Sequence, residues 1–434
     1  MKTIAAHTLG CKVNQYDTEA MLELFRHSGY SIVSMDSDAD VYLVNTCTVT
    51  GTGDKKSLQL IRRIRREHPS AGLIVCGCMA QQRGEDLLSL GADLILGTQR
   101  RNEVVELYHQ VSRSGHPLCA VEPLKKGQPF ENLSITEQIE HTRAVLKIQE
   151  GCDNHCSYCI IPSVRGPIRS RTLNDIQNEV NRLADAGYRE IVLTGIHLCS
   201  YGRDLDPAVT LLDVIRLIQK TDGILRIRLG SLEPVIATPE FASELKKADK
   251  ICPQFHLALQ AGCDTVLARM RRRYNTSQYL RGVDNLRREF PHAAFTTDIL
   301  TGFPGETEEE FAETKAFIEK IGFARIHVFP YSPRPGTPAA DMPGQLSSAE
   351  KEKRARELIS LGGRVAKEYL SSWIGLETDL LPEEMVDGCW EGYTPEYIRV
   401  RLEHGNCRSG IPVRIRLLNA GSRVMCGEQI KESE

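Results

Sequence analysis

The sequence lacks three features that would narrow its function at once. It has no excess of basic residues, since 54 lysines and arginines stand against 57 aspartates and glutamates, for a net charge of −3. The charge therefore gives no global sign of nucleic-acid binding. No apolar run approaches the roughly 18 residues of a membrane span, and Met1 to Ala6 do not form the apolar core of a signal peptide. We expect no membrane contact and a cytoplasmic location, where thiols stay reduced and the 14 cysteines favour metal binding over disulfides.

Three of these cysteines follow a short apolar run at close spacing. Residues 144–148 are rich in β-branched side chains and predict a strand, after which Cys152, Cys156 and Cys159 form the pattern C-x3-C-x2-C. Thiolates this close suit a soft metal or an iron–sulfur cluster, and three protein ligands would leave one iron of a cubane cluster open. The alternatives are a zinc site completed by His155, which would be strained beside Cys156, and a core of three apolar cysteines.

Three further cysteines each follow a predicted strand in the first part of the chain. These strands are predicted at residues 3–8, 41–44 and 71–75. Helical patterns separate them, which predicts a parallel α/β sheet whose carboxyl strand ends share one edge. We therefore expect Cys11, Cys47 and Cys78 to converge at that edge and to hold a cluster. Buried loop cysteines are the alternative, and Cys76 is a possible confounder of Cys78.

Strand–helix alternation continues for about six rounds between residues 142 and 369. The strands are predicted at residues 144–149, 190–193, 225–229, 254–257, 294–299 and 325–328. The helices are predicted near residues 174–186, 211–219, 239–247, 276–289, 307–320 and 349–369. This pattern predicts a partial barrel of parallel strands with its site at their carboxyl ends.

The last residues, 370–434, lose the helical period and alternate apolar with polar side chains. The alternation predicts a small antiparallel β-barrel. This segment has seven basic residues against eleven acidic ones, although an RNA-binding module is usually basic. The basic side chains that alternate on its strands, and that we expect to gather on one face, are Arg399, Arg401, Arg414 and Arg416. The expected division of the chain is 1–114, a polar connection at 115–141, 142–369 and 370–434.

The cysteine pattern after a first strand resembles the radical S-adenosylmethionine (SAM) superfamily. The downstream stretch SVRGPIRSR, residues 163–171, is similar to the methylthiotransferase family of that superfamily. Segments 8–19, 45–50 and 77–81 resemble the three cysteine boxes of that family, and the C-terminal segment resembles its TRAM RNA-binding domain. The resemblance thus covers nearly the whole chain.

The resemblance implies two [4Fe–4S] clusters. The cluster on Cys152, Cys156 and Cys159 would bind SAM at its open iron and cleave it to a 5′-deoxyadenosyl radical. The second cluster, on the three N-terminal cysteines, would deliver sulfur, and a second SAM molecule would supply the methyl group. A radical is needed because an aromatic C–H is too weakly acidic for a side-chain base to remove.

Glycine and polar residues at the predicted strand ends resemble family segments that bind SAM. The position of Gly195 contacts the amino group of SAM in the superfamily, and glycine lets a ligand approach the backbone. The residues that we predict to bind SAM are Gly195, His197, Glu233, Gln260, Asp298 and Arg165. For Gln260 and Asp298 the alternatives are turn and helix-capping roles, and for Arg165 a solvated position.

Two local groups of basic residues stand out in this acidic chain. The first lies on a helix predicted at residues 55–67, and its members are Lys55, Lys56, Arg62, Arg63, Arg65 and Arg66. The second comprises Arg271, Arg272 and Arg273. We predict that both groups face RNA phosphates. A solvated helix face and a helix end stabilised by its dipole are the alternatives.

The sequences around the N-terminal cysteines indicate one branch of the family. TLGCKVNQ (8–15) and NTCTVT (45–50) are similar to the branch that acts on N6-threonylcarbamoyladenosine at tRNA position 37. The resemblance implies an enzyme that converts the C2–H of that adenine to C2–SCH3, with the tRNA anticodon stem-loop as partner and an electron donor such as a flavodoxin or ferredoxin. The alternatives are the isopentenyladenosine or ribosomal-protein branches, an iron–sulfur RNA-binding protein without catalysis, and zinc-stabilised binding modules.

Overall fold

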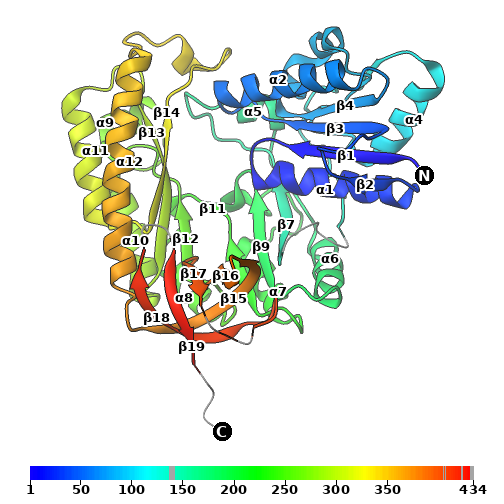
Figure 1. Ribbon diagram of the computed structural model, residues 1–434. Coiled ribbons are helices and arrows are strands. Elements are labelled where there is room, and N and C mark those ends of the chain that lie inside the picture. Colours follow the sequence, from blue (N-terminus) through cyan, green and yellow to red (C-terminus); the bar gives the residue numbers. More distant parts are fainter. Residues whose placement is uncertain (136–141, 404, 406, 422–423, 431–434) are drawn as a thin grey trace.

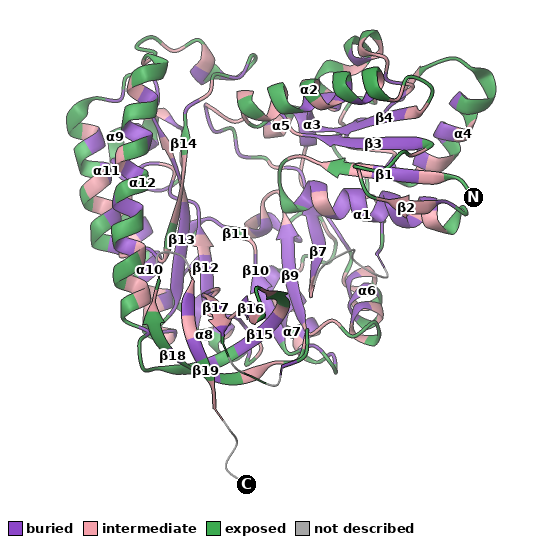
Figure 2. Ribbon diagram, viewed as in Figure 1, coloured by how far each residue is buried: buried purple, intermediate pink, exposed green. Residues whose placement is uncertain are grey.

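The computed structural model describes residues 1–135, 142–403, 405, 407–421 and 424–430. They form an N-terminal α/β sheet, a central open barrel of strands and helices, and a small C-terminal β-barrel (Figure 1). This architecture confirms the predicted fold class. Figure 2 shows that the buried residues follow the strands and the inner faces of the helices. In the described part of the chain, no helix combines the length and the apolar composition that a membrane crossing requires.

Six parallel strands form the N-terminal sheet in the order β2-β1-β3-β4-β5-β6. They are β1 (Thr3–Thr8), β2 (Ser31–Val33), β3 (Val41–Thr46), β4 (Gly72–Gly77), β5 (Leu94–Ile95) and β6 (Leu118–Cys119). The helices are α1 (Lys12–His27), α2 (Gly51–Glu67), α3 (Cys78–Arg83) and α4 (Val104–Ser114). Phe25 of α1 and Tyr108 of α4 pack on one face, and Ile61 and Ile64 of α2 pack on the other. The three predicted strands are therefore the centre of a larger sheet.

The segment 115–141, which we interpreted as a connection, belongs in part to the folded core. Leu118 and Cys119 form β6, which extends the parallel sheet beyond β5. Leu133 and Ile135 are buried against Tyr16 of α1 and the central barrel. The sequence did not predict β6, because a two-residue strand is too short to show a hydrophobic period and the segment around it is polar. Residues 136–141 of the expected connection lie outside the described residues.

The central barrel consists of two four-stranded sheets, in the orders β10-β9-β7-β8 and β11-β12-β13-β14. The strands are β7 (Arg143–Glu150), β8 (Arg169–Ser170), β9 (Glu190–Gly195), β10 (Arg226–Leu229), β11 (Ser231–Leu232), β12 (Gln254–Leu257), β13 (Ala294–Thr301) and β14 (Arg325–Pro330). The helices are α5 (Ile161–Arg165), α6 (Leu173–Asp185), α7 (Leu211–Gln219), α8 (Pro239–Lys246), α9 (Asp264–Arg269), α10 (Thr276–Glu289), α11 (Glu308–Ile321) and α12 (Ser348–Ser371). All pairs are parallel except the short edge pair β7–β8. The six predicted strands and six predicted helices are confirmed.

Five strands close the C-terminal barrel in the order β15-β16-β17-β19-β18. They are β15 (Glu377–Val386), β16 (Cys389–Tyr393), β17 (Arg399–Leu402), β18 (Val413–Ala420) and β19 (Met425–Gln429). The pairs are antiparallel as predicted, except that β17 and β19 run parallel. Arg399 and Arg401 both bind Glu391, while Arg414 and Arg416 pair with carboxylates of β15. The four arginines thus form two ion-paired groups rather than one free basic face.

The C-terminal barrel packs against the amino ends of the central strands. The guanidinium of Arg143, the first residue of β7, lies 4.7 Å from the ring centre of Tyr393, and that of Arg228 in β10 lies 4.6 Å from Tyr397. Arg226, the first residue of β10, donates to the carbonyl of Tyr393 over 3.0 Å. Figure 1 shows this module below the central strands. The C-terminal barrel therefore leaves the carboxyl ends of the strands uncovered, and this is where the functional site of such a barrel lies.

Candidate cluster and SAM site

The C-x3-C-x2-C loop begins where β7 ends. Gly151 makes the turn with φ +74°, and a Cβ there would lie 1.9 Å from the carbonyl oxygen of Pro167, so only glycine fits. Burial raises the pKa of Cys152 to about 11 and that of Cys159 to about 12, and the nearby thiol of Cys156 adds to both shifts. The structure therefore brings these three thiols together. His155, the alternative fourth ligand, is exposed.

The side chain of Arg272 points inward to the cysteine loop and does not face solvent. Its Nη1 donates to Sγ of Cys156 over 3.1 Å, and its Nη2 donates to Oε1 of Glu233 over 2.7 Å. Only 7% of the side chain is exposed. This placement corrects its predicted contact with RNA, because short-range sequence spacing cannot tell which of three adjacent arginines turns inward. Arg271 and Arg273 are exposed.

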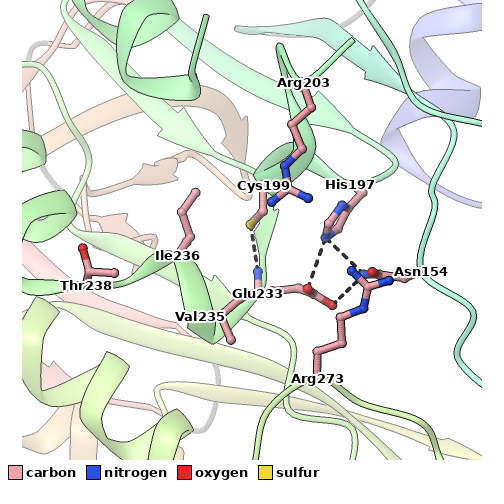
Figure 3. A pocket seen from close by; sticks show the side chains of 9 residues that line it. All are labelled: Asn154, His197, Cys199, Arg203, Glu233, Val235, Ile236, Thr238 and Arg273. Carbon is pink, nitrogen blue, oxygen red and sulfur yellow. Dashed lines mark hydrogen bonds and ion pairs between the residues drawn. The ribbon is translucent and has the colours of Figure 1, made fainter. Parts of the chain in front are cut away.

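A pocket of about 340 Å³ opens beside the cysteine loop. Its lining residues are Asn154, His197, Cys199, Arg203, Glu233, Val235, Ile236, Thr238 and Arg273. Figure 3 shows the Glu233 carboxylate facing His197 and Asn154: Oε2 lies 3.3 Å from His197 Nε2, and Oε1 accepts from Asn154 Nδ2 over 3.1 Å. Burial alone would raise the pKa of Glu233, but these contacts and the charge of Arg272 lower it to about 2. The pocket thus carries a permanent carboxylate next to the three thiols.

The other predicted SAM residues lie outside the lining of this pocket. Gly195 ends β9, and a Cβ there would lie 2.9 Å from the Cβ of Gln149, so the neighbouring strand already fills the space. Gln260 has φ +69° and its N–H donates to the carbonyl of Asp298, which fits the turn role. The Asp298 carboxylate lies 3.4 Å from Nε2 of His256. These three residues are therefore not part of the lining of the pocket at Glu233.

The N-terminal triad forms at the ends of three adjacent strands. Cys11, Cys47 and Cys78 follow β1, β3 and β4, which are neighbours in the sheet. A Cβ on Gly10 would lie 3.1 Å from Sγ of Cys47. Burial, together with the nearby thiols of Cys78 and Cys11, raises the pKa of Cys47 to about 11. The predicted convergence is therefore present in the structure. Cys76 packs in the apolar core of the sheet instead.

One cysteine of the N-terminal triad packs against the segment that follows the C-x3-C-x2-C loop. Cys78 packs against Ile160, the residue after Cys159, and against Val164 of α5. Arg165, fully buried, donates from Nε to Sγ of Cys78 over 3.2 Å. We predicted that Arg165 binds SAM, but it lies outside the pocket because its side chain crosses to the N-terminal domain.

A buried ionic network holds this boundary. Arg165 Nη1 lies 3.1 Å from Asp17 and 3.0 Å from Glu150, and Lys147 binds the same two carboxylates at 2.7 and 2.6 Å. Arg101 also binds Asp17. Burial alone would raise the pKa of Asp17, but the charges of Arg101, Lys147 and Arg165 lower it. Lys147, the one charged residue in the apolar run 144–148, was a sequence signal for this network.

The N-terminal domain also contacts the opposite edge of the open barrel. The loop after β14 donates from Arg334 Nη2 to Oγ1 of Thr48 over 2.9 Å, and the same guanidinium binds Asp54. The N–H of Gly51 donates to Oγ of Ser332 over 3.0 Å. The domain therefore spans from the β7 edge to the β14 edge, above the carboxyl ends of the barrel strands.

The donor sets fit iron–sulfur clusters. Each triad offers three thiols without a histidine or carboxylate among them, and all 14 cysteines are free of disulfides. In a cubane cluster each thiolate binds a different iron atom. Among the described residues, no group of three or more His, Cys, Asp or Glu side chains is arranged to hold a single metal ion.

The predicted basic helix is α2, and most of its cations are exposed. The exposed ones are Lys55, Lys56, Arg62, Arg63 and Arg66. Arg65 differs: it is 23% exposed, donates to the carbonyls of Ala71 and Gly91 over 2.9 Å and 2.6–2.9 Å, and binds Asp93. Arg65 therefore ties the helix end to the sheet and is not available for RNA, which corrects that part of the prediction.

The comparisons with known proteins agree with this construction. Residues 3–97 match the family described as "Uncharacterized protein family UPF0004", and residues 146–318 match the radical SAM superfamily. A threonylcarbamoyladenosine tRNA methylthiotransferase of Bacillus subtilis is 41% identical over 97% of this chain and 95% of its own length. One from Thermotoga maritima is 35% identical over 100% and 99%.

Among solved structures, the fold resembles a radical SAM methyltransferase of Kitasatospora setae that holds cobalamin and a [4Fe–4S] cluster. The TM-score is 0.58 at 15% identity, covering 78% of this chain and 77% of that chain. This likeness shows the fold alone. Identity of 41% over nearly the full length of both chains shows more: the chain belongs to the radical SAM methylthiotransferase family.

Proposed function

We propose that this enzyme adds a methylthio group to C2 of N6-threonylcarbamoyladenosine at position 37 of tRNA. Two relatives named threonylcarbamoyladenosine tRNA methylthiotransferases match 97% and 100% of the chain. The observation that carries the proposal is the contact of Cys78 with Ile160, next to Cys159. This contact joins the segments that carry the two cysteine triads. An activity that couples radical formation to sulfur transfer requires such proximity.

The pocket at Glu233 is the proposed SAM site. Cys152, Cys156 and Cys159 would hold the cluster, which would supply the one electron needed for reductive cleavage of SAM. The Glu233 carboxylate offers an acceptor for the SAM amino group, while His197 and Asn154 hold that carboxylate in place. Arg273, which we predicted to face RNA, lines this pocket, and here we propose that it offers a cation to the SAM carboxylate instead. Gly195, Gln260 and Asp298 remain proposed SAM contacts.

Cys11, Cys47 and Cys78 are the proposed ligands of a second [4Fe–4S] cluster. Their all-thiol donor set and their shared sheet edge support this assignment. Arg165 donates to Cys78, and such a hydrogen bond favours the thiolate over the thiol. This second cluster is the proposed source of the inserted sulfur.

The anticodon stem-loop is the proposed substrate segment. The exposed cations of α2 and Arg271 would bind its phosphates, and the C-terminal barrel would act as a TRAM module. Because its arginines are paired with carboxylates, we expect that barrel to attract tRNA phosphates less strongly than α2 does. A flavodoxin or ferredoxin in the cytoplasm is the proposed electron donor. The proposed domains remain 1–114, 142–369 and 370–434, with the connection at 115–141 contributing β6.

Mass analysis of digested tRNA tests the substrate. A strain that lacks the gene should accumulate N6-threonylcarbamoyladenosine without its 2-methylthio derivative, and the wild-type gene should restore the derivative. A Cys156→Ala gene is the matched control and should not restore it. If the strain lost methylthiolated isopentenyladenosine instead, the enzyme would belong to the branch that acts on isopentenyladenosine in tRNA.

A further inference from the structure

One arginine joins the SAM pocket to a cluster ligand. Arg272 directs Nη1 to Sγ of Cys156 over 3.1 Å and Nη2 to Oε1 of Glu233 over 2.7 Å. A guanidinium holds its donors in one plane, so these two contacts fix its orientation. The same group therefore touches a sulfur that binds the cluster and a carboxylate that lines the pocket.

The position of Arg272 is set from three sides. Its Nε donates to Oη of Tyr274 over 3.0 Å, and its guanidinium lies 4.8 Å from the centre of that ring. The hydroxyl of Tyr274 in turn donates to the carbonyl of Leu259 over 3.0 Å. Glu233 is itself held by His197 and Asn154. A side chain held this firmly delivers its hydrogen bond to Cys156 at little further entropic cost.

A hydrogen bond from a cation to a cluster thiolate increases the affinity of the cluster for an electron. Reduction adds one negative charge to an iron–sulfur cluster, and the reduction potential depends on net charge and on hydrogen bonds to the sulfurs. A buried guanidinium beside Cys156 stabilises the more negative, reduced state. Because the side chain is 7% exposed, water screens this effect only weakly.

We infer that Arg272 raises the reduction potential of the cluster on Cys152, Cys156 and Cys159 through its bond to Cys156, and that Glu233 keeps it in position. Arg272 thus acts as a positioning and tuning residue for radical formation. The inference rests on the SAM-cleaving cluster and is independent of which tRNA nucleoside is modified. Arg165 makes the comparable bond to Cys78 in the other triad, so the two clusters would have separate tuning residues.

The test is a redox titration followed by electron paramagnetic resonance, without SAM or tRNA. The parent is the Cys11, Cys47 and Cys78→Ala protein, reconstituted without oxygen, in which one cluster gives the signal. Arg272→Gln should lower the ratio of reduced to oxidised cluster at least tenfold at a fixed potential, which for one electron is a midpoint about 59 mV more negative. Arg272→Lys keeps the charge and loses the two-pronged contact, so its midpoint should fall between the two.

Arg271→Gln is the matched control, since Arg271 is adjacent, exposed and of the same chemical type. Its midpoint should equal that of the parent. If Arg272 were only structural, Arg272→Gln would lower the melting temperature of the metal-free protein without moving the midpoint, and the inference would be overturned. If the Arg272→Gln protein holds no iron, the Arg272→Lys protein provides the test instead. A midpoint of Arg272→Lys equal to that of the parent would overturn the inference. A parent without any cluster signal would instead refute the assignment of Cys152, Cys156 and Cys159.

Discussion

Nε of Arg165 donates a hydrogen bond to Sγ of Cys78 over 3.2 Å, from the central barrel into the N-terminal domain. Arg165 ends the short helix α5 that follows the radical SAM cysteines, and Cys78 begins α3 at the end of β4. The same guanidinium binds Asp17 and Glu150, and all three side chains are buried. One buried charged group therefore contributes to the relative position of the two triads, which leads to the first prediction.

Replacing Arg165 with Gln should destabilise the metal-free protein by about 3 kcal/mol, because removing one partner of a buried ion pair leaves its carboxylates undercompensated. Arg101 and Lys147 still neutralise Asp17, so the loss should stay at the lower end of the usual range. Urea unfolding measures it. Arg169→Gln is the control: Arg169 is also buried, and the described residues include no ion-pair partner for it. Equal losses in both variants would mean that burial, not pairing, matters here.

Glu233 should make the fold sensitive to acid in a defined range. Its pKa is lowered from 4.5 to about 2 by His197, Arg272 and Asn154. The ionised group therefore stabilises the fold above about pH 4.5, and this stabilisation, about 3 kcal/mol, is lost as the pH falls towards 2. Unfolding of metal-free Glu233→Gln should show a correspondingly smaller pH dependence between these values. The same slope in both proteins would contradict the lowered pKa.

Removing the radical SAM triad should leave one cluster. We expect the Cys152, Cys156 and Cys159→Ala protein, purified without oxygen, to hold about half the iron of the wild type, because the other triad is a separate site. Iron and acid-labile sulfide analysis measures this. Cys76→Ala is the control and should keep all the iron, since Cys76 packs in the apolar core. Iron that falls to zero, or does not fall, would refute two independent sites.

The two triads should divide the reaction. Cys47→Ala should still cleave SAM to 5′-deoxyadenosine but form no methylthio group on tRNA. Cys156→Ala should lose both activities, because two thiolates are a poor anchor for a cubane cluster. Both products are measured by mass spectrometry, with circular dichroism to show that each variant is folded. Methylthiolated tRNA from Cys47→Ala at the normal rate would show that the sulfur comes from elsewhere.

The exposed face of α2 should contact tRNA phosphates. Changing Arg62, Arg63 and Arg66 to Gln should weaken tRNA binding and reduce its salt dependence by roughly one slope unit per lost contact. Binding measured at several salt concentrations gives the slope. Arg65→Gln is the contrasting variant: it should keep the slope and lower the free energy of unfolding by about 2 kcal/mol, because its carbonyl contacts are lost. An unchanged slope in the triple variant would make this a merely solvated face.

The sequence by itself determined the family, the class of fold and both cysteine triads. Each of these depends on short-range information: the spacing of Cys152, Cys156 and Cys159, and strand–helix alternation that places Cys11, Cys47 and Cys78 after strands. Parallel pairing then brings the ends of β1, β3 and β4 to one edge without further specification.

Only the tertiary structure decided what the arginines do. Arg65 and Arg272 look like the exposed arginines beside them in sequence, and nothing local distinguishes Arg165, yet each of the three turns inward to a partner distant in sequence. Arg165 and Cys78 are 87 positions apart, and Arg272 and Cys156 are 116 apart. No local period encodes such a pair, because burying a guanidinium becomes favourable only when the folded chain supplies acceptors that replace water.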